Sequence, residues 1–286
     1  MYLEFLGLRE KPFSVTSDPS FLYLSRKHRE ALSHMIYGIR ERKGFVAITG
    51  EIGSGKTTLC KSLLRHLDET TRTALILHSN LSELQLLHAI VEDFGLNPSR
   101  GNRLGLFTQL NQFLLEQAEL GRNTAVIIDE AQNLSLRLLE QIRMISNFET
   151  DKDKLIQIIL VGQPQLREKL AQPQLEQLRQ RIAVRYHISP LDLDEVRTYI
   201  EHRLRTAGAD GTLEWTPDAT ELVHRYAKGV PRLINVLCDR CLLACYILRV
   251  KRVDGEIVRR SFRELSGQVQ DDDRDRPDEG GPDEPH

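Results

Sequence analysis

Apolar residues form alternating short runs and helical stripes over the first two thirds of the chain. Over residues 28–42 they recur three and four positions apart, which predicts an amphipathic helix. The short run Phe45–Ile48 ends before Gly50 and predicts a buried strand. Further helices are expected near 55–67, within 83–121 and over 136–148, and further strands over 73–78, 124–129, 155–161 and 183–188. These strands lack regular polar positions, as parallel strands covered on both faces do, so we expect an α/β fold with a parallel sheet layered with helices.

The pattern changes after Pro190. Helical spacing then continues over 192–205, 217–227, 231–248 and 254–265, and Pro217 and Pro231 stand where a first helical turn accepts proline. We therefore expect a small all-α domain to follow the α/β domain. The expected division is an N-terminal, mostly irregular arm at 1–27, the α/β domain at 28–190, the helical domain at 191–265 and a disordered acidic tail at 266–286.

Charge is unevenly distributed along the chain. The 286 residues hold 39 Lys and Arg against 41 Asp and Glu, with 40% hydrophobic residues, as in ordinary soluble proteins. Residues 271–286 hold eight acids and two arginines, so the tail carries −6 and the rest of the chain +4. This balance does not indicate a strongly basic nucleic-acid binder, but it leaves contact with phosphate, lipid or DNA open.

Nothing in the sequence indicates membrane insertion or secretion. The longest apolar run, Cys241–Leu248, is far shorter than the roughly 20 residues of a membrane-spanning helix. No basic and apolar leader opens the chain, and four cysteines in a chain of this length do not form a disulfide framework. A cytoplasmic protein is expected.

The most informative motif follows the first predicted strand and opens the next predicted helix. It is the string Gly50-Glu51-Ile52-Gly53-Ser54-Gly55-Lys56-Thr57, which matches the phosphate-binding P-loop. Its glycines let backbone N–H groups converge on phosphate oxygens, and the helix adds its positive end. Lys56 is expected to reach the β- and γ-phosphates, and Thr57 to hold Mg²⁺. We expect this string and Thr58 to bind ATP; the alternative is a glycine-rich turn that happens to precede a helix.

A second motif closes the strand predicted over 124–129. This apolar strand ends in Asp129-Glu130. In P-loop proteins the first such acid holds the Mg²⁺ shell and an adjacent Glu polarises the attacking water. We expect Asp129 on the Mg²⁺ side with Thr57, and Glu130 as the catalytic base, which favours ATP hydrolysis over passive nucleotide binding.

Three further features are consistent with an oligomeric ATPase, each with a simpler alternative. Gln163 follows the strand over 155–161 and would orient the water, or it is a turn residue. Arg179 or Arg181 would project into a neighbouring subunit's site as an arginine finger, or they end a solvated helix. Arg232 would reach the nucleotide from the helical domain, or it is a basic surface residue.

Taken together, these residues resemble the AAA+ ATPases of the ExeA-like family (general secretion pathway protein A), over about residues 1–265. The P-loop and the acidic strand are shared by many NTPases, and other strings are more specific to the family. These strings are Phe5–Phe13, Asp18–Tyr23, His28–Leu32, Ile128–Leu134, Val161–Pro164, Leu178–Ile182 and Gly229–Asn235.

The resemblance implies ATP bound between an α/β domain and a helical lid, in oligomers whose arginines act across interfaces. It assigns the finger to Arg179 or Arg181, the first sensor to Gln163 and the second to Arg232. Full-length secretion members continue into a transmembrane helix and a wall-binding part, whereas this chain continues after Leu265 into a polar acidic tail. This departure puts the wall-binding role in doubt and leaves the ATPase untouched.

The sequence thus predicts an Mg²⁺-dependent ATPase whose nucleotide state drives assembly of a homo-oligomer. A protein partner in a secretion, polysaccharide or pilus system is expected, with peripheral attachment to the inner membrane through that partner left open. Two alternatives remain: a DNA-associated AAA+ regulator of the transposition type, and a nucleotide-gated assembly scaffold.

Two side-chain groups have alternative interpretations. Phe13, Phe21 and Tyr23 are expected either to cover the adenine or to pack against the α/β domain. Cys238, Cys241 and Cys245 recur at helical spacing, which favours a core stripe over a zinc site.

Overall fold

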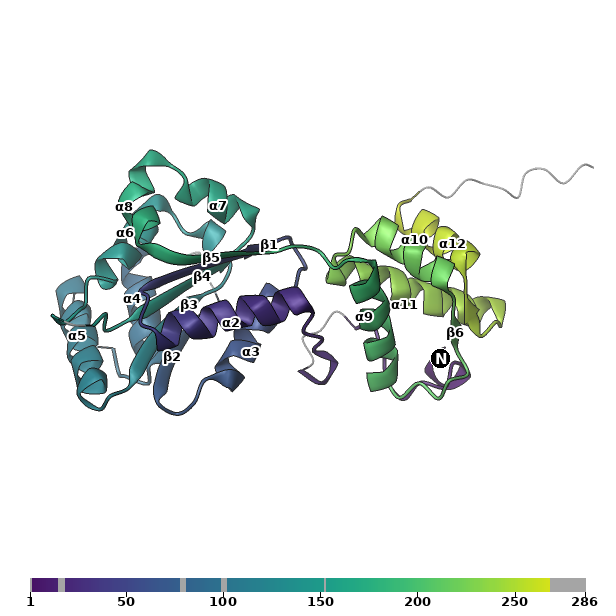
Figure 1. The fold of residues 1–286 in the computed structure, drawn as a ribbon, viewed down its shortest axis with the longest axis horizontal. Coiled ribbons are helices and arrows are strands. Elements are labelled where there is room, and N and C mark those ends of the chain that lie inside the picture. Colours follow the sequence, from purple (N-terminus) through teal and green to yellow (C-terminus); the bar gives the residue numbers. More distant parts are fainter. Residues whose placement is uncertain (1, 15–18, 78–80, 99–101, 152, 268–286) are drawn as a thin grey trace, which may run out of the picture.

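The computed structural model describes residues 2–14, 19–77, 81–98, 102–151 and 153–267. The α/β part and the helical part lie end to end along the long axis of the molecule (Figure 1). The last residue of the predicted strand over 73–78 and most of the predicted tail over 266–286 fall outside the described residues.

The α/β part is built on a five-stranded parallel sheet in the order β2-β3-β4-β1-β5. Its strands are β1 (Phe45–Gly50), β2 (Thr71–Ile76), β3 (Asn123–Ile128), β4 (Gln157–Gly162) and β5 (Ile182–Ile188). Every residue of the inner strands β1 and β4 is buried, as continuous apolar runs require. The predicted α/β fold is confirmed.

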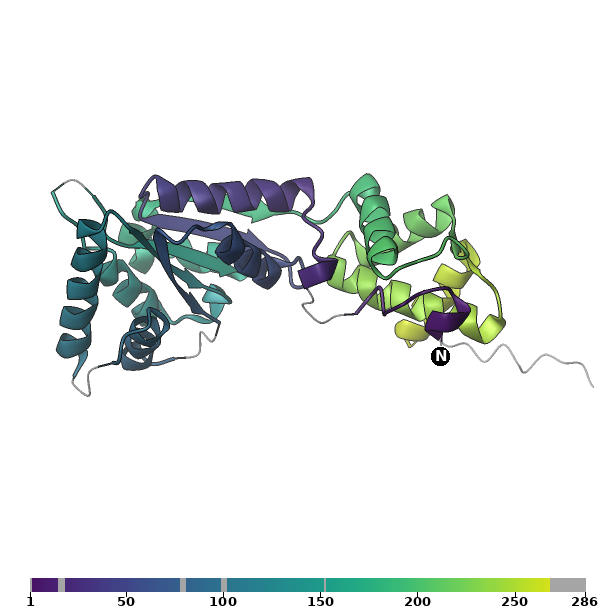
Figure 2. The same cartoon turned by 90° about the horizontal axis from the view of Figure 1, so that it is seen from below.

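Helices cover both faces of this sheet. Alternate residues of one strand face opposite sides, so Val46 and Ile48 pack with α2 and α3, whereas Phe45 and Ala47 belong to the core on the other face. Figure 2 shows α2 along one side of the sheet and the teal helices on the other. The helices are α2 (Arg26–Arg40), α3 (Lys56–His66), α4 (Glu83–Asp93), α5 (Arg103–Glu119), α6 (Leu136–Ile145), α7 (Pro164–Leu170) and α8 (Glu176–Arg181).

The second part, the lid, is helical with one small exception. Its helices are α9 (Leu193–Thr206), α10 (Pro217–Ala227), α11 (Pro231–Leu248) and α12 (Gly255–Leu265). Two short parallel strands, β6 (Glu214–Trp215) and β7 (Arg252–Val253), pair beside them, so the expectation of a purely helical domain is wrong in this detail. The predicted cysteine stripe is buried in the lid core, where burial raises the pKa of Cys241 and of Cys245 to about 12.

The N-terminal arm is an integral part of the lid core. It begins with α1 (Tyr2–Phe5) and includes a 3₁₀ turn at Pro19–Phe21. Leu6, Phe13 and Phe21 are buried among lid side chains, and the Phe13 ring lies 6.0 Å from that of Trp215. The expectation that these aromatic residues pack against the α/β domain is therefore wrong, because the nearest large apolar surface is that of the lid.

A buried lid arginine holds the arm in place. Arg203 of α9 is 6% exposed and donates to the carbonyl oxygens of Pro12 at 2.5 Å and Ser14 at 2.9 Å. Its guanidinium also lies over the Phe21 ring, 4.6 Å from the centroid. These contacts satisfy a charge that would otherwise be costly to bury.

Candidate nucleotide site

A cavity of about 410 Å³ opens where the α/β part, the arm and the lid meet. The P-loop forms its floor, the arm contributes Phe21 and Tyr23, and the lid contributes Arg203 and Arg232. Glu130 and Gln163 line it from the ends of β3 and β4. Because β4 lies between β3 and β1, these two side chains stand beside the loop that follows β1.

The P-loop connects the end of β1 to the start of α3, as predicted. Gly53 and Gly55 have φ of 78° and 91°, a region that L side chains rarely adopt. A Cβ atom on Gly53 would lie 2.5 Å from the Cβ of Arg232. Glycine is therefore needed at position 53 both for the turn and for the approach of the lid.

Lys56 lies at the base of the cavity and is 5% exposed. Its Nζ donates to the carbonyl oxygens of Gly50 and Glu51, at 2.9 Å each. Burial lowers the pKa of Lys56, while the nearby carboxylates of Glu130 and Asp129 act in the opposite direction. This places a cation in the loop where the helix also directs its positive end.

Two oxygen ligands suited to Mg²⁺ meet at the start of α3. The Thr57 hydroxyl donates to Oδ2 of Asp129 at 2.5 Å, and Asp129 is 2% exposed. Its other oxygen, Oδ1, accepts from the backbone N–H of Glu130 at 2.9 Å. A hydroxyl and a fixed carboxylate, beside a phosphate-binding loop, fit a hard cation that prefers oxygen ligands.

Glu130 is held by two side-chain amides. Gln163 Nε2 donates to Oε2 of Glu130 at 3.1 Å, and Gln132 Nε2 donates to the same oxygen. Gln132 also accepts from the backbone N–H of Gln163 at 3.0 Å, which ties the ends of β3 and β4 together. The sequence analysis offered a role for Gln163 but none for Gln132, although Gln132 is a polar residue in the string that follows β3.

The lid meets the P-loop through the first turn of α11. Gly229, with φ of 68°, packs against the Leu191 backbone, and Pro231 opens the helix. The backbone N–H of Arg232 then donates to the carbonyl oxygen of Gly53 at 3.3 Å. The Arg232 side chain is exposed and lines the cavity.

The chain is similar to known proteins in sequence and in fold. A family model described as an AAA domain matches residues 39–170. Over 270 residues, 93% of this chain, the sequence is 44% identical to general secretion pathway protein A of Aeromonas hydrophila. The chain belongs with the AAA+ proteins. It spans about half, 49%, of the length of that relative.

Solved structures share the fold of this AAA+ chain at low sequence identity. The ORC2 protein of Aeropyrum pernix, solved as ADPNP-ADP complexes, matches with a TM-score of 0.65 and 21% identity over 91% of this chain and 72% of that chain. CDC6P from Pyrobaculum aerophilum matches with a TM-score of 0.64 and 18% identity, over 89% and 70% of the two chains.

The two candidate finger arginines, Arg179 and Arg181, do not line the cavity. Arg181 donates to Ser146 Oγ at 3.0 Å and to the Asn147 side chain. Arg179 has a half-exposed side chain with an ion pair to Glu176 at 4.0 Å. Arg181 is thus held within its own chain, and Arg179 is the more available of the two.

His28 and Arg203 also line the cavity, and sequence reasoning gave neither a role in the site. Both act through contacts with distant segments: His28 with the P-loop and Arg203 with the arm. The His28–Leu32 string carries part of the family resemblance, and this was the one feature of the sequence that could have pointed to His28 as a residue of the site. For Arg203, the sequence showed only a basic residue within a predicted helix, which does not indicate a role in the site.

Proposed function

We propose that this AAA+ chain binds ATP with Mg²⁺ and hydrolyses it to ADP and phosphate. The observation that carries the proposal is the contact between Thr57 and Asp129, 2.5 Å apart, beside Lys56 and facing the cavity that Glu130 lines. Cation ligands, a phosphate-binding cation and a base thus lie within a single site. The lid contributes Arg232, which lines the same cavity next to Gly53 of the P-loop.

Each side chain then has a definite task. Bound Mg²⁺ would supply neutralising charge on the phosphate oxygens. Lys56 and the loop N–H groups bind the phosphates, and Thr57 with Asp129 holds the cation. Glu130 accepts a hydrogen bond from the attacking water, and Gln163 keeps the carboxylate oriented. Arg232 adds positive charge from the lid side.

The proposal extends to assembly. The availability of Arg179 supports a homo-oligomer in which this arginine completes a neighbouring site, so that ATP binding favours assembly. Similarity to general secretion pathway protein A supports a partner in a secretion system. A partner in a polysaccharide or pilus system, and attachment at the inner membrane through the partner, remain part of the proposal without support from that name. None of the helices in the described ranges is long and apolar enough to cross a membrane.

ATP turnover tests the enzyme assignment. Wild type, Lys56→Ala and Glu130→Gln are compared with Mg²⁺ and with excess EDTA. Each substitution and EDTA are expected to lower turnover at least about a hundredfold, as losses of charge stabilisation or of a base do. Glu140→Gln is the matched control, because Glu140 is an acid of α6 that does not line the cavity. Comparable turnover in all four proteins would refute the assignment.

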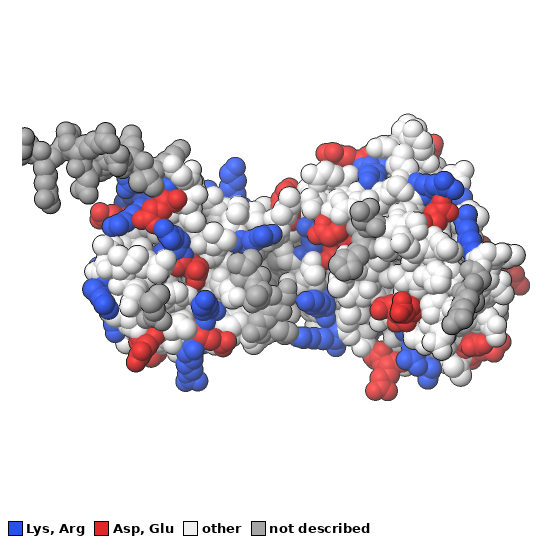
Figure 3. Space-filling model, turned by 180° about the vertical axis from the view of Figure 1, so that it is seen from behind, with Lys and Arg blue, Asp and Glu red and all other residues white. Residues whose placement is uncertain are grey.

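The two alternatives are separated by further measurements on the same proteins. A nucleotide-gated scaffold predicts that Glu130→Gln stays assembled with ATP and still binds its partner. A DNA-associated regulator predicts ATP-dependent binding to duplex DNA that weakens steeply with salt. Basic and acidic side chains are interspersed over both parts on the face seen in Figure 3, so this face has no continuous basic surface of the kind that duplex DNA favours.

A further inference from the structure

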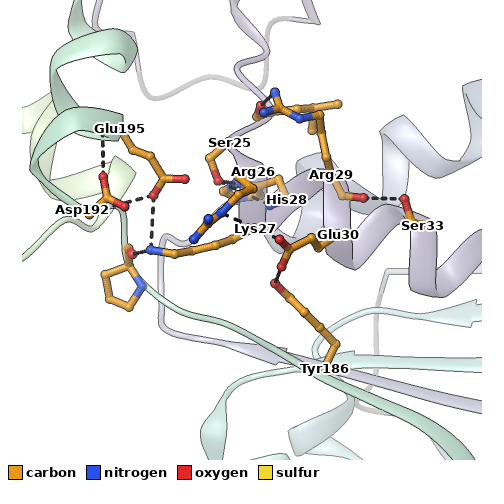
Figure 4. A network of polar contacts seen from close by, with 12 residues as sticks. Ser25, Arg26, Lys27, His28, Arg29, Glu30, Ser33, Tyr186, Asp192 and Glu195 are labelled. Atoms are coloured by element: carbon orange, nitrogen blue, oxygen red, sulfur yellow. Dashed lines mark hydrogen bonds and ion pairs between the residues drawn. The ribbon is translucent and has the colours of Figure 1, made fainter.

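The first turn of α2 contacts three separate parts of the molecule. Ser25 caps this helix and accepts from the backbone N–H of His28 at 3.3 Å. The next residues reach outward from the cap: Figure 4 shows Lys27 directed to Glu195 of the lid and Glu30 meeting Tyr186 of β5. His28 instead points to the P-loop.

The His28 ring is buried between Ser25 and the P-loop. Its Nε2 lies 2.7 Å from the carbonyl oxygen of Ser54, and its Nδ1 lies 2.8 Å from the Ser25 hydroxyl. A carbonyl oxygen only accepts, so Nε2 carries the hydrogen and Nδ1 accepts from Ser25. Burial lowers the pKa of His28, which favours this neutral form.

This contact fixes the direction of one peptide group in the P-loop. In a planar trans peptide, the carbonyl of Ser54 and the N–H of Gly55 point in opposite directions. Because the Ser54 carbonyl faces His28, the Gly55 N–H faces away from His28. Gly55 caps α3, where free N–H groups bind phosphate. His28 also limits the space here, since a Cβ on Gly55 would lie 3.1 Å from its Nε2.

The preceding residue ties the same helical turn to the lid. Lys27 Nζ donates to the carbonyl oxygen of Pro190 at 2.6 Å and pairs with Glu195 at 3.2 Å. Pro190 lies in the segment that connects β5 to α9, and Glu195 belongs to the capping box at the start of α9. The side chains of the ion pair are only 16% and 13% exposed, so solvent screens it weakly.

We propose that the first turn of α2 is a joint that holds the phosphate loop and the lid in one arrangement. His28 is a positioning residue that directs the Gly55 N–H toward the phosphates. Lys27, one residue before it, holds the start of the lid, which carries Arg232. The inference rests on the proposed nucleotide function and adds two residues that touch no reacting atom.

A pair of amide substitutions tests His28. The Gln amide reaches to the position of Nε2 and retains a donor to Ser54, whereas the shorter Asn amide stops near the position of Nδ1. His28→Gln is expected to bind a fluorescent ATP analogue within about threefold of wild type, and His28→Asn about tenfold more weakly, the effect of one lost hydrogen bond at the phosphates. Equal affinities for the two variants would overturn the proposal.

A double-mutant cycle tests Lys27. If Lys27 positions the lid, Lys27→Met weakens ATP binding only where Arg232 is present, so Lys27→Met and Arg232→Ala are non-additive. Arg26→Met is the matched control, because Arg26 is 73% exposed and pairs with Glu30 at 3.8 Å. It is expected to be additive with Arg232→Ala. Additive effects of Lys27→Met would overturn the coupling.

A measurement on wild type keeps the test independent of how the variants fold. The ¹⁵N NMR spectrum of His28 is expected to show a neutral ring protonated at Nε2, and protonation at Nδ1 would overturn the proposal. Failure of wild type to bind ATP would instead overturn the proposed function. The two failures are thereby distinguishable.

Discussion

At the residue scale, His28 makes stability depend on pH. Burial lowers its pKa in the folded protein, opposed by the hydrogen bond to the Ser54 carbonyl and by Glu195, and assisted by Lys27. At pH values well above about 6.5, the ordinary pKa of His, the ring is neutral in both the folded and the unfolded chain, so it causes no pH dependence there. Below this pH the unfolded chain takes up the proton first, and the free energy of unfolding falls.

We therefore expect wild type to lose stability between pH 7.5 and pH 5.5, and His28→Gln to lose less. Urea unfolding at the two pH values measures the difference. The pKa of His202 is also lowered by burial, but this residue is present in both proteins, so its contribution cancels in the comparison. An equal loss in the two proteins would contradict the prediction.

The individual residues of the site differ in how far the sequence predicts their location. Lys56, Thr57 and the pair Asp129-Glu130 are predictable because each lies in a contiguous string whose residue types the chemistry requires. Their roles remain predictions until turnover is measured. Gln132 and His28 act on partners 31 and 26 positions away, at Gln163 and Ser54. Such contacts depend on the packing of whole elements, which local patterns do not encode.

At the element scale, the arm behaves as part of the lid. Phe13 is 1% exposed and contacts the lid core, although it lies about 180 residues before α9 in the sequence. The lid helices can be predicted from the sequence, because apolar residues recur three and four positions apart within each of them. The arm has no such period, so its docking on the lid could not be predicted. Packing of its aromatic residues against the α/β domain was the wrong alternative, whereas Phe21 and Tyr23 line the cavity and their contact with adenine stays a prediction.

We expect Phe13→Ala to destabilise the lid by about 3–5 kcal/mol, the cost of removing a buried aromatic side chain. Leu120→Ala is the control, because Leu120 is 63% exposed and its truncation is expected to change stability by less than about 0.5 kcal/mol. Chemical unfolding measures both. Hydrogen exchange then locates the loss, which is expected in α9 to α12 before the sheet. A loss confined to the arm would contradict the integral packing.

Two of the shortest elements were not predicted, for a related reason. β6 and β7 have two residues each, too few to show a period. α8 has six residues, and only its end at Arg179 and Arg181 was considered from the sequence. α8 bears on the proposed assembly, because its last turn contains the two candidate finger arginines. Its position beside β5 determines where Arg179 and Arg181 stand.

At the scale of the whole molecule, the site of one chain contains every proposed group except the finger. The cavity brings together the P-loop, Glu130, Gln163 and Arg232, whereas Arg179 and Arg181 lie outside it. Arg181 is held by Ser146 and Asn147 of its own chain. We therefore expect Arg179 to act on a neighbouring chain, and Arg181→Ala to affect stability more than catalysis.

Mixing two inactive variants tests this expectation. Arg179→Ala retains an intact cavity but lacks the finger, and Glu130→Gln retains the finger but lacks the base. Each alone is expected to hydrolyse ATP at least about a hundredfold more slowly than wild type. In a mixed assembly, an Arg179→Ala chain supplies Glu130 to its own cavity, and a Glu130→Gln neighbour supplies Arg179 to it. Turnover is therefore expected to recover in proportion to the fraction of interfaces of this kind. Arg181→Ala is the control and is expected to be active without mixing. Mixtures as inactive as their components would show that Arg179 does not act across an interface.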